Sequence, residues 1–334
     1  MPTLSQQENH TTFSSPLGEA GRGFTFIPSG GLANRMRAIA SAVNLSRLTG
    51  ISVEIVWFRD WGLNARFCDI FQPISTPGIT LRDATWLDKL TLDRPRRHNL
   101  YIPRLYQALR FRRRIDEQQV TPLKQQGFDF CQWALQEDKK EKRKEKNNIP
   151  EDDNTPPQQE NHIKHSSPWG RLGGVYMSCY QVFGEFHDYD ALIRELFQPK
   201  ADILSKVDAY VRQFSDYTIG LHIRRTDNQE SINGSPLQSF IDIVNDELRQ
   251  HPTLTVYLAT DDEPTKQEMR HLFGQRVITP DAPATRGSLD GIRDGLVDMW
   301  TLSRTNVIYG SKGSSFSDMS RSLRPLPASP KGRS

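Results

Sequence analysis

The fold is decided by the stretch TIGLHIRRTD, residues 218–227. Its first half is a short apolar run bounded by polar residues, a pattern typical of a buried strand in a parallel sheet. Its second half places His, two Arg and an Asp where that strand ends. In open α/β sheets the carboxyl ends of strands are where ligands bind. The stretch therefore predicts a site for an anion such as pyrophosphate, and a solvated turn is the alternative.

Side chains alternate between the two faces of a strand, so His222 and Arg224 are expected on one side and Arg225 on the other. A guanidinium group stays charged and binds phosphate oxygens through two hydrogen bonds. We predict that Arg224 neutralises a departing nucleoside diphosphate without a metal ion. Arg225 either contacts the same nucleotide or pairs with Asp227 at the surface.

Outward from this stretch, strand and helix patterns alternate through the second half of the chain. Apolar runs predict strands at 218–223, 253–259, 276–278 and 306–309. Helical periodicity predicts helices at 236–249, 264–273 and 289–303, with a final helix after the loop 310–316. This alternation indicates a doubly wound α/β unit.

The first half opens with a β-α-β pattern of its own. A strand at 24–27 and a Pro-Ser-Gly-Gly turn precede a helix from Asn34 to Gly50, and a second strand covers 51–58. Such a unit favours a parallel sheet. Residues 60–135 read as short helical and loop segments without a clear order. A strand at 174–180 and helices at 190–197 and 203–214 follow.

The predicted fold class is α/β with two Rossmann-like units. The boundaries are a disordered tail at 1–22, a first unit at 23–200, a second unit at 201–322 and a disordered tail at 323–334. The length of 334 residues suits two domains. Within the first unit, a charged run followed by Asn, Pro and Gln predicts a disordered insertion at 137–167.

Bulk properties exclude some partners. A net charge of +3 gives no reason to expect a nucleic-acid partner. Three cysteines without metal-ligand spacing indicate free thiols in a reducing compartment. We expect no signal peptide, because the first twenty residues are polar and lack an apolar core, and no apolar run is long enough to cross a membrane. We therefore expect a soluble, cytoplasmic protein.

The turn after the first strand is a candidate binding element. Gly30 and Gly31 allow a phosphate or sugar close to the backbone, and Asn34 follows at a helix start that favours anions. A turn that needs glycine for its dihedral angles is an equal interpretation. The third glycine of a dinucleotide fingerprint is missing. NAD binding remains an alternative, with Glu54 or Asp60 as the ribose acid.

Two later strand ends also carry polar side chains. Asp261 and Asp262 follow one strand, where Asp262 suits a helix cap and Asp261 suits the paired N–H donors of guanine. Ser314 and Ser315 precede the final helix, where they suit phosphate contacts or capping. The Asp-x-Asp at 188–190 has the form of a metal-binding motif, but capping of a helix is favoured.

Arginines crowd one region that has few acids. The patch suits an anionic acceptor or a membrane surface, and a solvated basic helix is the plainer interpretation. Its members are Arg94, Arg96, Arg97, Arg104, Arg110, Arg112, Arg113 and Arg114.

Together these motifs resemble the GDP-fucose-dependent fucosyltransferases, the group of α1,6-, nodulation-type and protein O-fucosyltransferases. The stretch 219–227 is close to their His-x-Arg-Arg-x-Asp signature. Ala259-Thr260-Asp261-Asp262 looks like their second motif, and the stretch from Asp298 to Phe316 looks like their third. The turn 30–35 is similar to their glycine-and-asparagine turn. The resemblance covers roughly residues 24–60 and 216–320.

The resemblance implies a GT-B architecture, with two Rossmann-like domains facing across a cleft. It also implies inverting transfer of fucose from GDP-fucose to a glycan or glycolipid-type acceptor, without metal or cofactor. Arg224 would stabilise the leaving GDP, and Asp227 and Glu230 are the nearest carboxylates for a catalytic base. Donor-binding residues would be Gly30, Gly31, Asn34, His222, Arg224, Arg225, Asp261, Ser314, Ser315 and Phe316. A dinucleotide-dependent oxidoreductase and a non-catalytic nucleotide-binding protein are the alternatives.

Overall fold

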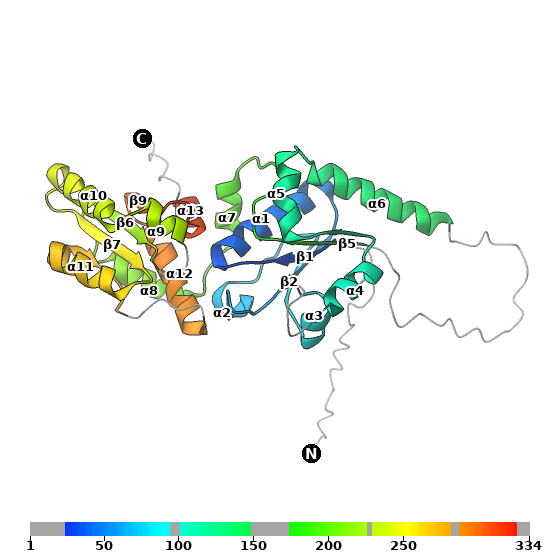
Figure 1. Cartoon of the computed structure of the whole chain (residues 1–334), viewed down its shortest axis with the longest axis horizontal. Coiled ribbons are helices and arrows are strands. Elements are labelled where there is room, and N and C mark those ends of the chain that lie inside the picture. Colours follow the sequence, from blue (N-terminus) through cyan, green and yellow to red (C-terminus); the bar gives the residue numbers. More distant parts are fainter. Residues whose placement is uncertain (1–23, 94–100, 148–173, 226–228, 282–286, 326–334) are drawn as a thin grey trace, which may run out of the picture.

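The computed structural model describes residues 24–93, 101–147, 174–225, 229–281 and 287–325. Within them the chain forms two parallel β-sheets with helices packed on their faces (Figure 1). The α/β prediction is therefore confirmed.

The first sheet has the strand order β3-β2-β1-β5-β4, and every neighbouring pair is parallel. Its strands are β1 (Phe24–Pro28), β2 (Val53–Trp57), β3 (Ile79–Asp83), β4 (Arg113–Ile115) and β5 (Val175–Cys179). The helices of this part are α1 (Leu32–Thr49), α2 (Phe67–Ile70), α3 (Trp86–Thr91), α4 (Ile102–Arg110), α5 (Glu117–Gln125), α6 (Phe130–Asn147) and α7 (Tyr189–Leu196).

The second sheet has the order β8-β7-β6-β9 and is also parallel. Its strands are β6 (Thr218–Ile223), β7 (Thr255–Thr260), β8 (Val277–Ile278) and β9 (Val307–Gly310). The helices are α8 (Ala201–Val211), α9 (Gln229–Gly234), α10 (Leu237–Gln250), α11 (Glu263–Phe273), α12 (Leu289–Ser303) and α13 (Ser315–Ser322).

Each sheet has one strand where the winding direction reverses. In the first sheet β1 lies between β2 and β5, and in the second β6 lies between β7 and β9. The crevice beyond the carboxyl end of such a strand is the usual ligand site of an open α/β sheet. The turn after β1 holds Gly30 and Gly31, and Arg224 follows β6.

Local chemistry explains several helix ends. Gly50 ends α1 in a left-handed conformation at φ 69°. Asp262 caps α11 by accepting the N–H of Thr265, and Asp188 caps α7 by accepting the N–H of Ala191. The capping roles predicted for both aspartates are confirmed.

One apolar core cluster joins the first sheet to helices of the second half. It contains Phe26 and Trp57 of the first sheet together with Leu296 and Trp300 of α12 and Met319 of α13. Helix α13 packs on α1 and α7 as well as on α12. The last helices of the chain therefore bury apolar surface against the first half.

Two boundary predictions are wrong within the described residues. Residues 137–147, expected to be disordered, form the second part of α6, because Glu137 is buried and paired with Arg112 and Lys140. The C-terminal tail was predicted from 323, yet Leu323 is buried in the core and Arg324 donates to the carbonyl of Thr305. The remaining predicted disorder, at 1–22, 148–167 and 326–334, lies outside the described residues.

Among the described residues, no helix combines the length and apolar character needed to span a bilayer. The three cysteines are free thiols, as predicted from their number and spacing.

Candidate functional site

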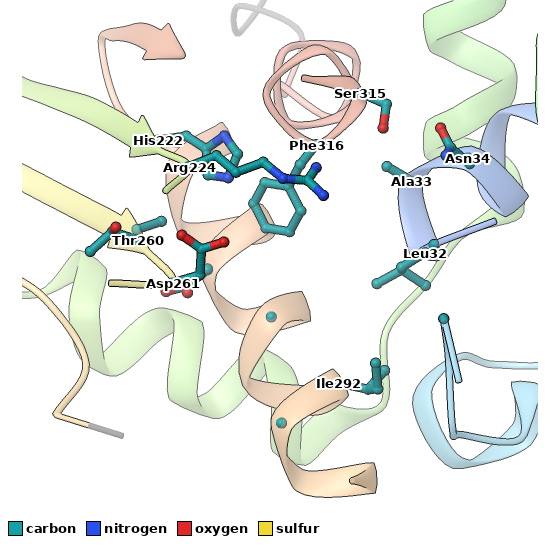
Figure 2. Close-up of a pocket in the computed structure, with 16 residues that line it drawn as sticks. Leu32, Ala33, Asn34, His222, Arg224, Thr260, Asp261, Ile292, Ser315 and Phe316 are labelled. Atoms are coloured by element: carbon teal, nitrogen blue, oxygen red, sulfur yellow. The ribbon is translucent and has the colours of Figure 1, made fainter. Parts of the chain in front are cut away.

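A cavity of about 410 Å³ lies where the carboxyl ends of several strands meet (Figure 2). Residues from both halves of the chain line it, with the turn after β1 on one side and the ends of β6 and β7 on the other. Its walls are made by Gly31, Leu32, Ala33, Asn34, Gly62, His222, Arg224, Ala259, Thr260, Asp261, Gly291, Ile292, Gly295, Asp298, Ser315 and Phe316.

Arg224 is the cation that the second sheet presents to this cavity. It is half-buried, and its backbone N–H donates to the Ser311 hydroxyl at 3.0 Å, which fixes the residue at the strand end. Figure 2 shows its guanidinium extending toward the side where Leu32 and Asn34 lie. The prediction that Arg224 faces a ligand space is consistent with this placement.

Arg225 is not among the residues that line the cavity. Its backbone N–H donates to Asp261 Oδ1 at 2.9 Å, and its guanidinium reaches the carbonyl of Ile232 in α9. The alternation expected along the strand therefore separates the two arginines.

His222, near the end of β6, directs its side chain to the start of α13. Its Nδ1 is 2.8 Å from the Ser317 hydroxyl and 3.4 Å from the Ser314 hydroxyl, and its ring stacks on Phe316 at a centroid distance of 4.6 Å. The carbonyl of His222 accepts the N–H of Ser311 at 2.9 Å. These contacts hold the loop after β9 against β6, so His222 positions the cavity wall.

Ser314 and Ser315 have different surroundings. Ser314 is buried beside His222 and is not part of the cavity lining, whereas Ser315 and Phe316 are. Ser315 is the first residue of α13, where unpaired backbone N–H groups favour an anion. Of the predicted phosphate-binding hydroxyls, only that of Ser315 faces the cavity within the described residues.

The turn after β1 is shaped by its glycines. Gly30 has φ 81°, a left-handed conformation that favours glycine, and a Cβ there would lie 2.9 Å from Asn34 Nδ2. Gly31 and Asn34 line the cavity, whereas Gly30 does not. The Oδ1 of Asn34 is buried, and among the described residues it has no hydrogen-bond partner. A buried acceptor without a partner is suited to a ligand hydroxyl.

Arg35 is a buried residue that the sequence did not single out. Its Nε donates to the carbonyl of Gly30 at 2.8 Å, its Nη2 lies 2.9 Å from Asp60, and its guanidinium lies over Trp57. Asp60 in turn accepts the N–H of Gly62, which lines the cavity. Arg35 thus connects two turns that form one wall. The sequence offered a signal for its burial, because Arg35 falls among the small and apolar residues that make up the buried part of α1.

Asp298 on α12 is a second carboxylate that lines the cavity, in addition to Asp261. It is buried and accepts a hydrogen bond from the Tyr257 hydroxyl at 2.6 Å. Burial raises the pKa of its carboxyl group to about 7, although the Tyr257 hydrogen bond opposes the shift. The charge of Asp298 is therefore sensitive to pH near neutrality and to any donor that a ligand brings.

The structure does not describe the side chains of the two residues predicted as catalytic bases. Asp227 lies outside the described residues, and Glu230 belongs to α9, with nothing described of its side chain. Among the described residues, no three His, Cys, Asp or Glu side chains cluster in a way that would hold a metal ion. The identity of a base and the independence from metal both stay predictions.

The arginine patch predicted at 94–114 is divided in the structure. Arg112 is 3.0 Å and Arg113 is 3.8 Å from Glu137, and Arg114 is 3.0 Å from Asp116. Arg104 is exposed on α4, and Arg110 is partly buried at the end of that helix. Arg94, Arg96 and Arg97 lie outside the described residues.

Comparison with known proteins gives a likeness of fold. No protein-family model matches the chain, and no curated protein matches its sequence. The NodZ α-1,6-fucosyltransferase, soaked with GDP-fucose, aligns at a TM-score of 0.54 and 17% identity over 91% of this chain and 93% of that structure. The fucosyltransferase NodZ from Bradyrhizobium aligns at a TM-score of 0.53 and 17% identity over 91% of this chain and 94% of that structure. POFUT1 in complex with GDP-fucose aligns at a TM-score of 0.53 and 11% identity over 91% of this chain and 95% of that structure.

At these identities the comparison establishes the fold. The chain has the α/β fold of these GDP-fucose-binding structures over nearly its whole length. The resemblance inferred from short sequence motifs is thereby confirmed at the level of the fold.

Proposed function

We propose that this protein is a glycosyltransferase of GT-B architecture that transfers fucose from GDP-fucose, with inversion and without a metal ion. The observation that carries the proposal is Arg224, a guanidinium directed into a cavity at the strand where the second sheet reverses its winding. A fixed cation at that point stabilises the charge that develops on a departing diphosphate. The two domains we propose are 23–200 and 201–322, facing across the cavity.

The donor would be held mainly by the second half. Ser315 and the backbone at the start of α13 are suited to the phosphates, together with Arg224. Asp261 and Asp298 are two acceptors on the same wall, and a carboxylate pairs well with the N1 and N2 donors of guanine. The carbonyl of His222 accepts the N–H of Ser311, and Asp261 Oδ1 accepts the backbone N–H of Arg225, so the nucleotide would share these acceptors with the protein.

The acceptor would enter beside the first half. Gly31 and Asn34 line the cavity opposite Arg224, and the unpartnered Oδ1 of Asn34 is suited to a sugar hydroxyl. We propose a glycan or glycolipid-type acceptor on this side. A protein base, if one acts, would be Asp227 or Glu230.

The alternative of NAD binding has less support. Its two candidate ribose acids have other partners: Glu54 pairs with Arg82 at 2.7 Å, and Asp60 pairs with the buried Arg35. A nucleotide-binding protein without transferase activity remains the second candidate, and turnover separates it from the proposal.

The first test is calorimetric titration with GDP, UDP and NAD in the presence of EDTA. We expect GDP to bind and the other two to bind far more weakly. Arg224→Ala should weaken GDP binding by roughly 10- to 100-fold, since charge-assisted hydrogen bonds contribute about 1.5–3 kcal/mol. Donor hydrolysis or transfer should fall by at least about 100-fold, because charge stabilisation at the leaving group is a large part of catalysis.

Arg225→Ala is the matched control, because that side chain is adjacent in sequence and does not line the cavity. It should retain most of the GDP affinity. If NAD or UDP binds in place of GDP, or if Arg224→Ala retains normal turnover, the proposed function is wrong. GDP binding without any donor turnover would favour the non-catalytic alternative.

A further inference from the structure

The outer sides of α3 and α4 carry an apolar surface. The two helices pack against each other at the edge of the first half (Figure 1). Large apolar side chains on both point to solvent, with Trp86 77% exposed and Leu105 64% exposed. We call this the α3–α4 surface, and it consists of Trp86, Leu87, Leu90, Tyr101, Ile102, Leu105 and Leu109.

Helix α4 leaves a leucine stripe exposed. The face turned to the protein carries Pro103, Tyr106 and the buried Gln107, whose side-chain N–H groups donate to the carbonyls of Leu92 and Asp93 at 3.1 and 3.2 Å. The face turned to solvent carries Leu105 and Leu109. Surface helices normally bury their apolar stripe. The outward apolar stripe of α4 is therefore a built feature of this helix.

The inner contacts fix this orientation. Tyr106 and Phe111 pack with Leu92 against Ile27 and Tyr176 of the first sheet. The Tyr176 hydroxyl also donates to the carbonyl of Leu92 at 3.0 Å. Because these contacts hold the inner side of α4, rotation of the helix to hide its leucines would expose Tyr106 and leave Gln107 and two carbonyl groups without partners.

The exposed charges beside the apolar side chains are positive. Lys89 and Arg104 are exposed on α3 and α4. The acids of residues 85–93, Asp88 and Asp93, are both buried, and Asp88 is paired with Arg82 at 2.7 Å. Residues 101–112 contain no acid. The surface thus combines leucine and aromatic side chains with a cationic rim.

We propose that the α3–α4 surface docks the protein onto an anionic lipid bilayer. An in-plane helix with leucines and aromatic side chains on one face and Lys or Arg beside it is the pattern of interfacial membrane binding. Tyr and Trp favour the interface between headgroups and acyl chains. Arg and Lys near the bilayer gain from the negative surface potential of anionic leaflets. A protein partner is the other class of occupant, and an apolar stripe rimmed by one sign of charge favours the lipid surface.

The test is sedimentation of the full chain with vesicles of phosphatidylcholine mixed with phosphatidylserine, and with vesicles of phosphatidylcholine alone. The chain should bind the anionic vesicles and bind the neutral ones much more weakly. The double variant Leu105→Gln/Leu109→Gln should lose at least roughly 100-fold in vesicle affinity, because two leucine side chains would no longer be buried in the bilayer. Arg104→Glu should weaken binding to the anionic vesicles alone.

Leu48→Gln and Leu272→Gln are the controls, because these leucines are 61% and 47% exposed on α1 and α11, away from α3 and α4. Both should bind vesicles like the unmodified chain, and circular dichroism should show that all variants are folded. Absence of binding to anionic vesicles overturns the proposal. Equal loss in the control variants also overturns it. A concentration-dependent dimer that the double variant abolishes would assign the surface to self-association instead.

Discussion

The two adjacent arginines after β6 have different surroundings although they are chemically identical. Arg224 lines the cavity, and Arg225 turns toward α9. The period of two along a strand predicted opposite sides for the two side chains, although both arginines follow Ile223, the last residue of β6, and Arg225 was also expected to contact the donor. The side on which Arg224 lies could thus be predicted from the short stretch 222–227.

Asp298 could not be found in the same way. It was named only as the first residue of a resembling stretch, since one Asp in a helical pattern gives no sign of burial. In the structure α12 presents one face to the cavity, with Gly291, Gly295 and Asp298 at helical spacing. A glycine inside a helix, such as Gly295, is costly and usually marks close packing or a ligand. That spacing was the signal available in the sequence.

The raised pKa of Asp298 predicts a pH-dependent stability. The folded chain holds this proton up to about pH 7, whereas the unfolded chain releases it near 3.8. The folded state therefore binds more protons between these values, and the free energy of unfolding falls as pH rises through that window. Asp298→Asn cannot ionise and keeps an acceptor for the Tyr257 hydroxyl.

The measurement is urea unfolding of both proteins at pH 5 and pH 8. The free energy of unfolding of the unmodified chain should fall between pH 5 and pH 8 by roughly 2 kcal/mol more than that of Asp298→Asn. A pKa shift of one unit corresponds to about 1.4 kcal/mol. The difference between the two proteins cancels the contributions of other groups. Identical pH dependence in both would show that Asp298 is ionised in the folded state throughout.

At the scale of elements, the strand and helix order of the second half was predictable because each element there has a clear period. Strands β3 and β4 were missed for a physical reason. Both are edge strands, and β4 consists of Arg113, Arg114 and Ile115, with its arginines held by acids from other elements. Helix α6 was missed because its charged half is anchored by Glu137, which pairs with Arg112, 25 positions earlier in the chain, and composition does not report such a contact.

The junction of β9 and α13 shows how one element positions another. Gly310 ends β9, and a Cβ there would overlap the side chain of Ser317, whose hydroxyl contacts His222. The strand and the helix can approach this closely only because residue 310 has no side chain. The wall formed by Ser315 and Phe316 depends on the same approach.

We expect Gly310→Ala to destabilise the protein by about 1–3 kcal/mol, the usual effect of overpacking in a core. The substitution should also weaken GDP binding, because α13 must shift. Gly295→Ala is the matched control for stability: a Cβ at residue 295 meets nothing within 4 Å, and alanine favours a helix by about 0.5–1 kcal/mol over glycine. Urea unfolding measures the first effect and calorimetry the second. Gly310→Ala with the stability of Gly295→Ala would contradict the packing argument.

At the scale of the whole molecule, the sequence predicted two units but not how they share a core. The apolar cluster that holds the first sheet also includes side chains of α12 and α13. Phe71 of the first half lies between Phe197 and Trp300, at centroid distances of 5.3 and 6.0 Å. Contacts between residues more than 200 positions apart leave no local pattern, so sequence alone could not place them.

Helices α12 and α13 belong to this cluster and also pack on strands of the second sheet, which predicts that the two halves unfold together. Trp300 is 5% exposed, and Trp300→Ala should lower the free energy of unfolding by about 3–5 kcal/mol through loss of burial and the cavity left behind. Hydrogen exchange followed by mass spectrometry in urea can report peptides of β1–β2 and of β6–β7 separately. Both should show the same transition midpoint in the unmodified chain, and both midpoints should fall in the variant.

Leu272→Ala, at a 47% exposed position on α11, serves as the control. It should change the free energy of unfolding of either half by less than about 0.5 kcal/mol. Separate midpoints in the unmodified chain would mean that the halves are stable independently and that the shared cluster contributes little. Coincident midpoints would mean that the cavity walls from the two halves are held by one cooperative core. In that case substitutions around Trp300 should reduce GDP affinity without touching the ligand, since the affinity depends on the spacing of the walls.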